Sequence, residues 1–435
     1  MLRKLTKTLK SDNMVVLLGN LLASACGLVS FMLLARFLSK SAFGEWAIFI
    51  SATGLVELMK TGLVRQALVK ELSSGKSDQE NKITLSSAWF LTIGLNVSLA
   101  AIVAFVGLFI DNKSLVLFFD YYPLFSLLGI AGSFSTWLAH AKGLFWEMNI
   151  IRVISNVLFL FFIGLIYFFG LELRQVVYGY LLATFISSIY GYFRFLSTIR
   201  FSDFSRERMQ QLLAFGKHSF ATLTGANLLK SADSLIIGGL MGTEAVAIYA
   251  IPLKVLDVLE IPLRGFVMTS FRKLVGFHSQ QNIRAFRHEI VKNIRSLSIL
   301  FFSGALVIFF MPRLVIEMLG GAGYEESVAL LQLFLIPAIL LPLDKFIGIS
   351  LDAANLPRLN AIKVWIMVLV NVIGDVVVIY LFDALWAVAL VTILNIVVGI
   401  AFGVFVNPVF RMGSNKIYTI KSMKAQKFAT GYERS

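Results

Sequence analysis

The sequence predicts an all-α integral membrane protein with about 12 transmembrane helices, arranged as two parallel six-helix halves around a central cavity. Three observations predict this fold class: the composition, a series of long apolar segments and an internal repeat. Of the 435 residues, 58% are hydrophobic and 15% are charged, and the mean hydropathy is +0.81. Soluble domains carry about 25% charged residues, so the composition excludes a water-soluble fold.

Apolar segments long enough to cross a bilayer recur along the whole chain. Because the hydrocarbon core is about 30 Å thick, each crossing needs roughly 20 mostly apolar residues. Twelve segments meet this requirement: 14–38, 43–69, 83–110, 121–141, 150–169, 175–193, 218–239, 246–271, 296–316, 327–350, 359–381 and 384–407. The second and the eighth segments carry several charges. The connections between segments are too short for a soluble domain.

The basic residues predict the orientation of these segments. With both termini on one side, 28 of the 39 Lys and Arg residues lie on that side and 5 on the other. By the positive-inside rule, the basic side is cytoplasmic. Arg3, Lys4, Lys7 and Lys10 precede a first segment that is too long for a signal peptide. We therefore expect an uncleaved first helix and two cytoplasmic termini.

An internal repeat predicts the two halves. At an offset of 203 residues, positions 42–70 match positions 245–273 with seven identities, among them Glu57 with Glu260. Since each half would contain an even number of spans, both halves have the same orientation in the membrane. We expect an N-terminal half at 1–200, an interfacial connector at 201–216, a C-terminal half at 217–408 and a basic cytoplasmic tail at 409–435.

Charged residues also occur within the predicted spans, and twelve of them are candidates for a position inside the membrane. They are Glu57, Lys60, Arg65, Lys230, Asp233, Lys254, Asp257, Glu260, Arg264, Asp344, Lys345 and Asp375. Exposure to lipid would cost about 3 kcal/mol each, or roughly 35 kcal/mol in total. These side chains must therefore face one another or a water-filled cavity.

The spacing of these charges agrees with that conclusion. Residues 254, 257, 260 and 264 fall on one face of a helix. Structural ion pairs without a ligand remain an alternative, above all for Lys254 with Asp257 and for Lys230 with Asp233. Arg65 and Lys345 lie near span ends, where a long side chain can instead reach the membrane interface.

Several function classes have no support in the sequence. Cys26 is the single cysteine, and the four histidines have no metal-ligand spacing. The sequence contains no GxxxxGK[ST] motif for ATP and no loop large enough for a catalytic domain. Basic residues are scattered over many loops that border spans, which does not fit nucleic-acid binding. We therefore expect neither an enzyme nor a metal or organic cofactor.

Two segments resemble a known family. Residues 35–47 (ARFLSKSAFGEWA) and 61–69 (TGLVRQALV) are similar to the start of bacterial polysaccharide-transport flippases of the O-antigen and capsule type. These proteins belong to the multidrug/oligosaccharidyl-lipid/polysaccharide exporter superfamily. The resemblance implies export of an undecaprenyl-pyrophosphate-linked oligosaccharide across the bacterial inner membrane, while the lipid tail stays in the bilayer through a lateral gap.

The charge of these residues and their depth in the spans suggest roles for them in such a transporter. A cationic route for the pyrophosphate would use Lys60, Arg65, Lys230, Lys254, Arg264 and Lys345. Candidates for coupling to H⁺ or Na⁺ are Glu57, Asp233, Asp257, Glu260 and Asp375. The expected partners are the lipid-linked oligosaccharide, membrane lipids, and the polysaccharide polymerase and assembly proteins.

Two alternatives remain open. The first is a cation-coupled drug antiporter of the same superfamily, although the first span has no acidic residue for cation exchange. The second is a membrane-embedded polysaccharide polymerase or glycosyltransferase, which the short outer loops disfavour. The membrane face on which lipid-linked oligosaccharide accumulates in a deletion strain distinguishes these alternatives.

Overall fold

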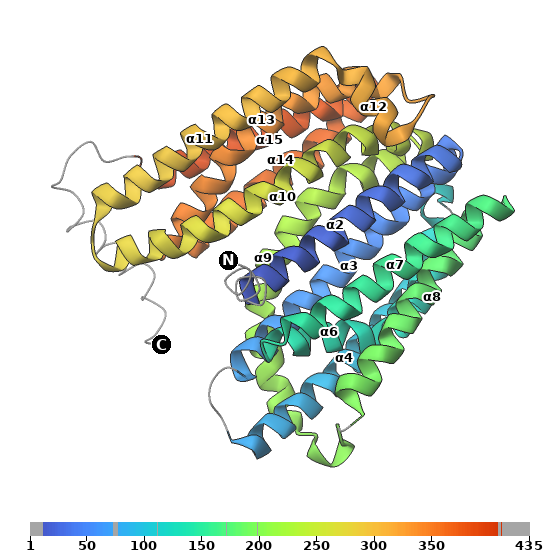
Figure 1. Ribbon diagram of the computed structural model, residues 1–435, viewed down its shortest axis with the longest axis vertical. Coiled ribbons are helices and arrows are strands. Elements are labelled where there is room, and N and C mark those ends of the chain that lie inside the picture. Colours follow the sequence, from blue (N-terminus) through green and yellow to red (C-terminus); the bar gives the residue numbers. More distant parts are fainter. Residues whose placement is uncertain are drawn as a thin grey trace, which may run out of the picture. The chain divides into compact units, whose positions relative to one another are not determined.

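The structure is a computed structural model that describes residues 12–72, 77–110, 112–170, 172–197, 199–407 and 410, except for the side chains of 12–18, 218, 219, 221 and 222. All regular elements in these residues are helices, and no strand occurs among them (Figure 1). The fold is therefore all-α, as the sequence predicts. The basic residues before residue 12 lie outside the described residues, as does the predicted tail at 409–435 except for residue 410.

The chain divides into two compact units. The first combines residues 1–255, 311–333 and 368–391, and the second combines 256–310, 334–367 and 392–435. The first unit contains the expected N-terminal half together with parts of the expected C-terminal half. Helices α10, α13, α14 and α15 contribute residues to both units.

The first unit contains most of the helices. Its complete elements are α2 (Asp12–Phe37), α3 (Lys40–Leu72), α4 (Asp78–Gly107), η1 (Lys113–Leu115), α5 (Val116–Leu128), α6 (Ile130–Ala141), α7 (Phe145–Phe169), α8 (Leu173–Gly191), η2 (Tyr192–Leu196), η3 (Phe201–Asp203), α9 (Arg206–Leu240) and α12 (Pro312–Gly320). Within this unit α3 packs along α9, and α7 packs between α2 and α8 (Figure 1).

The second unit is built around α11 (Ile283–Phe310). The shared helices are α10 (Thr243–Ser279), α13 (Glu326–Ala353), α14 (Pro357–Phe382) and α15 (Leu385–Val406). A buried apolar cluster that includes Leu263, Leu274, Ile290 and Phe346 joins α10, α11 and α13 within this unit.

Each of the twelve predicted segments coincides largely with helix, but they do not all form simple spans. Among the described residues, nine helices are long and apolar enough to cross a membrane. A tenth crossing is formed if η1–α5 and α6, which meet at 54°, count as one broken span. Helices α9 and α10, over predicted segments 218–239 and 246–271, are not among these ten.

Two predicted spans contain breaks. The segment 121–141 is interrupted at Gly129, where α5 ends and α6 begins in a new direction. The predicted end of the segment 296–316 is wrong, because α11 ends at Phe310 and a separate helix, α12, begins at Pro312. Proline has no backbone N–H and its φ is preset for a helix, so it suits the first position of a new helix.

The repeat of 203 residues reappears in the helix boundaries. The ends of α2 and α9 at Phe37 and Leu240 are 203 residues apart, and so are the starts of α3 and α10 at Lys40 and Thr243. The ends of α4 and α11, Gly107 and Phe310, keep the same offset. The correspondence therefore extends over three helices rather than one matched segment.

The expected interfacial connector does not form a separate element. Its residues from 206 onward belong to α9, a single helix of 35 residues that begins after Ser205. The Ser205 hydroxyl accepts a hydrogen bond from the backbone N–H of Arg208 and so satisfies a free donor of the first turn. A stretch with several charged residues thus continues directly into the predicted seventh span.

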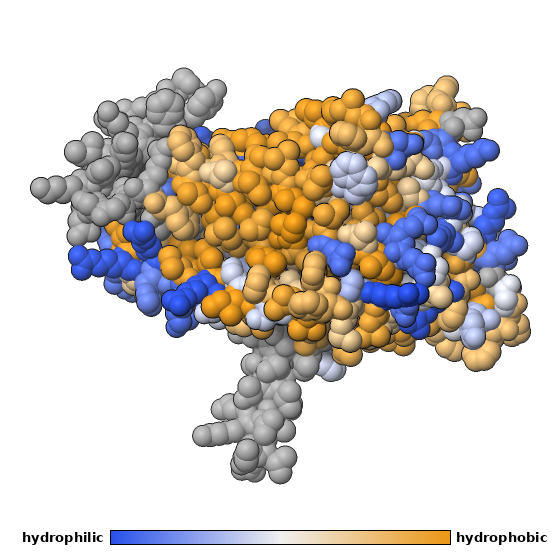
Figure 2. Space-filling model, turned by 90° about the horizontal axis from the view of Figure 1, so that it is seen from above, coloured by the Kyte–Doolittle hydropathy of each residue, from blue (hydrophilic) through white to orange (hydrophobic). Residues whose placement is uncertain are grey.

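The surface carries many large hydrophobic side chains. Phe168 is 82% exposed, Tyr380 is 77% exposed and Phe310 is 74% exposed. Figure 2 shows hydrophobic residues covering the middle of the visible face, with hydrophilic residues gathered toward its two ends. Contiguous apolar surface of this extent is stable in lipid rather than in water. The chain is a multi-pass membrane protein.

Candidate functional site

The first buried charge lies on α3. The Lys60 side chain is 2% exposed and forms an ion pair with Glu57, one turn earlier. Its ammonium group donates to Asn96 Oδ1 at 2.6 Å and to Ser126 Oγ at 3.2 Å. The Tyr122 hydroxyl donates to Glu57 Oε1 at 3.4 Å. The site thus compensates Lys60 fully within the protein, which is how a buried charge becomes tolerable.

Glu57 also faces a cavity of about 310 Å³ inside the first unit. The cavity lies among α3, α5, α6, α7 and α8, next to the break at Gly129. Hydroxyl groups supply much of its wall, including those of Thr61, Ser133, Thr136 and Ser155. Arg152 contributes a guanidinium group to the same wall.

A pair of buried carboxylates lies on α9 and α14, within the first unit. Asp233 is 5% exposed and Asp375 is 0% exposed. The Asn371 amide joins them, because its Nδ2 donates to Asp233 Oδ1 at 2.5 Å and to Asp375 Oδ2 at 3.0 Å. The Tyr249 hydroxyl donates to Asp233 Oδ2 at 2.7 Å. The structure thus joins two residues of the predicted coupling set that are 142 positions apart.

One oxygen of this pair has no protein partner. Asp375 Oδ1 is buried and accepts no hydrogen bond from the described residues. A buried carboxylate oxygen that receives no donor is costly. Two neighbouring carboxylates with such an oxygen have the chemistry to hold a proton or a hard cation.

The second unit holds a different arrangement of charges. Glu260 on α10 accepts hydrogen bonds from Arg264 and Lys345, each at 2.6 Å. The Arg264 and Lys345 side chains are 62% and 40% exposed, whereas the Glu260 side chain is 16% exposed. Two predicted cationic residues thus converge on one predicted coupling residue. The two cations and the one carboxylate together carry a net charge of +1.

Asp344 is paired with a lysine that the sequence analysis does not select. Lys363 on α14 is 3% exposed, forms an ion pair with Asp344 and donates to the Asp344 carbonyl oxygen at 3.2 Å. The sequence signal that could have identified Lys363 is its position inside the predicted span 359–381. Asn96, Ser126, Tyr122, Tyr249 and Asn371 are also absent from the predicted site, because uncharged side chains carry no sequence signal for burial.

The other predicted residues lie on α3, α9 and α10. Lys230 is exposed on α9, and Asp257 is half-buried in the second unit. The Lys254 ammonium lies 5.1 Å from the centroid of the Phe31 ring, within range of a cation–π contact. Arg65 is half-buried on α3, and its Nε is buried without a hydrogen-bond acceptor.

The corner between α2 and α3 contacts elements from much later in the chain. Arg36 donates to the carbonyl oxygens of Met318 at 2.7 Å and Glu317 at 3.2 Å, at the end of α12. The Tyr324 hydroxyl donates to the Ala35 carbonyl oxygen at 3.2 Å. Burial raises the pKa of Tyr324 to about 12, so the donor keeps its proton at neutral pH. Lys40 lies 3.6 Å from Glu326.

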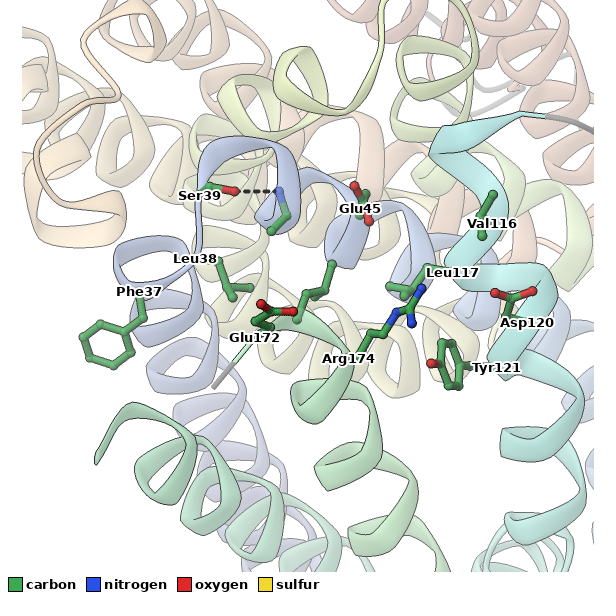
Figure 3. Close-up of a pocket in the computed structure, with 12 residues that line it drawn as sticks. Phe37, Leu38, Ser39, Glu45, Val116, Leu117, Asp120, Tyr121, Glu172 and Arg174 are labelled. Atoms are coloured by element: carbon green, nitrogen blue, oxygen red, sulfur yellow. Dashed lines mark hydrogen bonds between the residues drawn. The ribbon is translucent and has the colours of Figure 1, made fainter. Parts of the chain in front are cut away.

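A second cavity, of about 440 Å³, borders this corner (Figure 3). The carboxylates of Glu45, Asp120 and Glu172 and the guanidinium of Arg174 lie in its wall. Apolar side chains such as Leu117 complete it. Because acids outnumber bases here, this cavity does not favour a phosphate group.

A comparison with known families shows which family the chain belongs to. A family model described as "Polysaccharide biosynthesis protein" matches residues 33–329, which include both segments of the predicted resemblance. The chain belongs to the polysaccharide biosynthesis protein family. This membership confirms the resemblance to polysaccharide transporters. No curated protein matches the chain in sequence.

The solved structures with a similar fold include two transporters of the MOP superfamily and a lipid II flippase. An inward-facing multidrug resistance MATE transporter of the MOP superfamily aligns with a TM-score of 0.71 at 14% identity, over 90% of this chain and 96% of that one. The lipid II flippase MurJ aligns with a TM-score of 0.70 at 15% identity, over 90% of this chain and 87% of that one.

A third similar structure is that of a MOP superfamily transporter from Pyrococcus furiosus, which is described as having a binding pocket of reverse polarity. It aligns with a TM-score of 0.56 at 14% identity, over 90% of this chain and 93% of that one. These likenesses show that this polysaccharide biosynthesis family member has the fold of a MOP superfamily transporter.

Proposed function

We propose that this protein is a flippase for an undecaprenyl-pyrophosphate-linked oligosaccharide, the repeat unit of an O-antigen or capsule. It moves this lipid across the bacterial inner membrane by alternating access of an N-terminal half (1–200) and a C-terminal half (217–408), with both termini in the cytoplasm. Membership of a polysaccharide biosynthesis family supports this substrate class. The structural likeness to a lipid II flippase is consistent with a lipid-linked sugar.

The observation that carries the proposal is the buried carboxylate pair Asp233–Asp375, bridged by Asn371. A transporter without an ATP-binding motif needs an ion gradient, and ionisable groups inside a membrane protein mark ion pathways. Binding of H⁺ or Na⁺ at this pair would compensate the unpaired Asp375 oxygen. Glu57, Asp257 and Glu260 are the other candidates for coupling.

The cationic residues supply the second part of the mechanism. Arg65, Lys230, Lys254, Arg264 and Lys345 stabilise the pyrophosphate as it leaves the aqueous phase. Lys60, the sixth predicted cation, is already fully paired within the protein. Lys345 and Arg264 share one carboxylate, so this cluster keeps a net positive charge. The polyprenyl tail remains in lipid throughout, and the product passes to the polysaccharide polymerase and its assembly proteins.

The alternative is a cation-coupled drug antiporter, whose fold the chain matches as well as it matches the lipid II flippase. A deletion strain distinguishes the two. We expect the lipid-linked oligosaccharide to accumulate on the cytoplasmic face, where a lectin added to spheroplasts does not reach it. Complementation with the wild-type gene restores lectin labelling. Accumulation on the outer face would instead indicate a polymerase, and unchanged labelling with increased drug sensitivity would indicate an antiporter.

The matched control for the coupling site is Asp383→Asn, since Asp383 is exposed at the end of α14. It undergoes the same chemical change as Asp375→Asn without touching the carboxylate pair. We expect Asp375→Asn to abolish lectin labelling and Asp383→Asn to preserve it.

A further inference from the structure

Two arginines and a histidine gather at one end of the first unit without an acidic partner. Arg65 lies near the end of α3, His140 near the end of α6 and Arg152 near the start of α7. The charge of Arg65 acts on both Arg152 and His140, and the charge of Arg152 acts on His140. None of the three makes an ion pair with any residue that the structure describes.

The hydrogen bonds of this cluster are also incomplete. Arg152 Nη1 donates to Asn20 Oδ1 at 3.2 Å, which uses one of its five N–H donors. Arg65 Nε is buried and has no acceptor. Two neighbouring guanidinium groups repel each other, and an anion that binds beside them relieves this repulsion.

The cavity of about 310 Å³ lies directly beside this cluster, since Arg152 forms part of its wall. Nine other wall residues carry a Ser or Thr hydroxyl, a tryptophan or a tyrosine, among them Thr61, Ser133, Thr136, Trp137, Ser155 and Tyr180. The negative charge of Glu57, also in the wall, is compensated by Lys60. One end of the cavity is therefore cationic and the rest is uncharged, polar and aromatic.

We propose that this cavity is a binding site for a sugar phosphate. The Arg152 guanidinium binds the phosphate oxygens, the positive charge of Arg65 stabilises the same negative charge, and the hydroxyl and aromatic wall binds the sugar ring. Guanidinium groups match the geometry of phosphate oxygens, and sugar rings present both hydroxyls and apolar C–H faces. The volume accommodates a monosaccharide with one phosphate group rather than a long oligosaccharide.

This site extends the proposed flippase function and rests on it for its physiological ligand, the sugar attached to the pyrophosphate of the carrier lipid. By the predicted topology, the cluster lies at the cytoplasmic end of the N-terminal half. It would therefore select the substrate on the side where the lipid-linked sugar is made, before translocation begins.

Binding is measured with the full-length protein in phosphatidylcholine nanodiscs by isothermal titration calorimetry. The probes are glucose 1-phosphate, glucose and inorganic phosphate. We expect glucose 1-phosphate to bind at least about tenfold more tightly than either part alone, because both ends of the cavity contribute. Equal affinities for glucose 1-phosphate and inorganic phosphate would overturn the sugar half of the proposal.

The variants are Arg152→Gln, Arg65→Gln and, as a matched control, Lys142→Gln, which removes an exposed positive charge just after α6. We expect each arginine variant to weaken glucose 1-phosphate binding by about tenfold and the lysine variant to change it by less than about twofold. Arg152→Lys should recover part of the loss, because it restores charge without the planar guanidinium. Wild-type affinity in Arg152→Gln overturns the site.

The source of the phosphate is tested by adding phosphatidylglycerol to the nanodiscs. If this phospholipid displaces glucose 1-phosphate, the cluster binds a phospholipid headgroup and the proposal is wrong. The flippase function is scored separately in the complementation strain. Normal export by Arg152→Gln would refute the role of the site in transport without affecting the flippase assignment. Binding of glucose 1-phosphate by a wild-type protein that does not export would refute the flippase assignment alone.

Discussion

The Arg36 guanidinium donates to the Met318 carbonyl oxygen at 2.7 Å and so caps the C-terminal end of α12. The last carbonyls of a helix have no partner inside the helix, and a cation at this position also interacts favourably with the helix dipole. Arg36 lies in one of the two segments that resemble polysaccharide flippases. The contact therefore links a recognisable sequence feature of the N-terminal half to a short helix almost three hundred residues later.

Arg36→Gln should favour a state in which this corner has separated from α12. A hydrogen bond from a charged group contributes about 1.5–3 kcal/mol, which is enough to change the populations of two conformations about tenfold or more. Spin labels at positions 39 and 314, in a Cys26→Ser background, measure the distance distribution. Arg313→Gln is the control, because Arg313 pairs with Glu317 at an exposed site. An unchanged distribution in Arg36→Gln would contradict a conformational role.

Lys60→Met should destabilise the protein by about 3–5 kcal/mol, because it leaves Glu57 buried without its cation. Combining it with Glu57→Gln should recover most of this loss, since the double variant removes both charges. Thermal unfolding followed by tryptophan fluorescence measures the effect. If the double variant is less stable than Lys60→Met alone, Glu57 is not the main partner of Lys60.

Lys363→Met should be more destabilising than Lys345→Met. Lys363 is 3% exposed and its loss strands the Asp344 carboxylate, whereas Lys345 is 40% exposed and Arg264 also pairs with Glu260. We expect a difference of about 2 kcal/mol or more in the free energy of unfolding, measured by chemical denaturation in detergent. Equal losses would show that burial does not determine the importance of these lysines.

Gly44→Ala should prevent correct packing of α3 against the start of α10. A Cβ at Gly44 would lie 1.8 Å from the Thr243 carbonyl oxygen, so the backbone would have to move. Gly27→Ala on α2 is the control, because nothing lies within 4 Å of its added Cβ. We expect low yields of monodisperse Gly44→Ala protein in size-exclusion chromatography and normal yields of Gly27→Ala.

Export by Asp233→Asn and by Asp375→Asn should no longer respond to an ion gradient. Proteoliposomes are exposed in turn to an H⁺ gradient and to a Na⁺ gradient, and movement of a fluorescent lipid-linked sugar is recorded. The gradient that drives the wild-type protein identifies the coupling ion. Full gradient dependence in either variant would remove the carboxylate pair from the mechanism.

Helix positions are predictable from the sequence because a run of about 20 apolar residues has few other stable structures. All twelve apolar segments fall largely within helices. The break at Gly129 and the end of α11 at Phe310 are not predictable in the same way. A hydropathy window does not distinguish a straight crossing from two shorter helices that meet at an angle, because both have the same composition.

The candidate site is only partly predictable for a similar reason. A charge inside an apolar segment is conspicuous, and Lys60, Asp233 and Asp375 are found in this way. Their uncharged partners, Asn96 and Asn371, resemble many other polar residues until the fold brings them into contact. Arg152 and His140 are not identified from the sequence because they lie near helix ends. There, a sequence does not distinguish a solvated charge from one that faces a cavity.

The close approach of α3 and α9 determines where the lipid tail cannot go. Gly216 lies so near the Leu63 carbonyl oxygen that an added Cβ would be 2.0 Å from it, and Gly44 is in similar contact with Thr243 just after α9. The backbones are in contact near both ends of the interface between α3 and α9. This close packing leaves no space for a polyprenyl chain between the two helices. A carrier lipid whose tail extends sideways out of the protein must therefore pass through another wall.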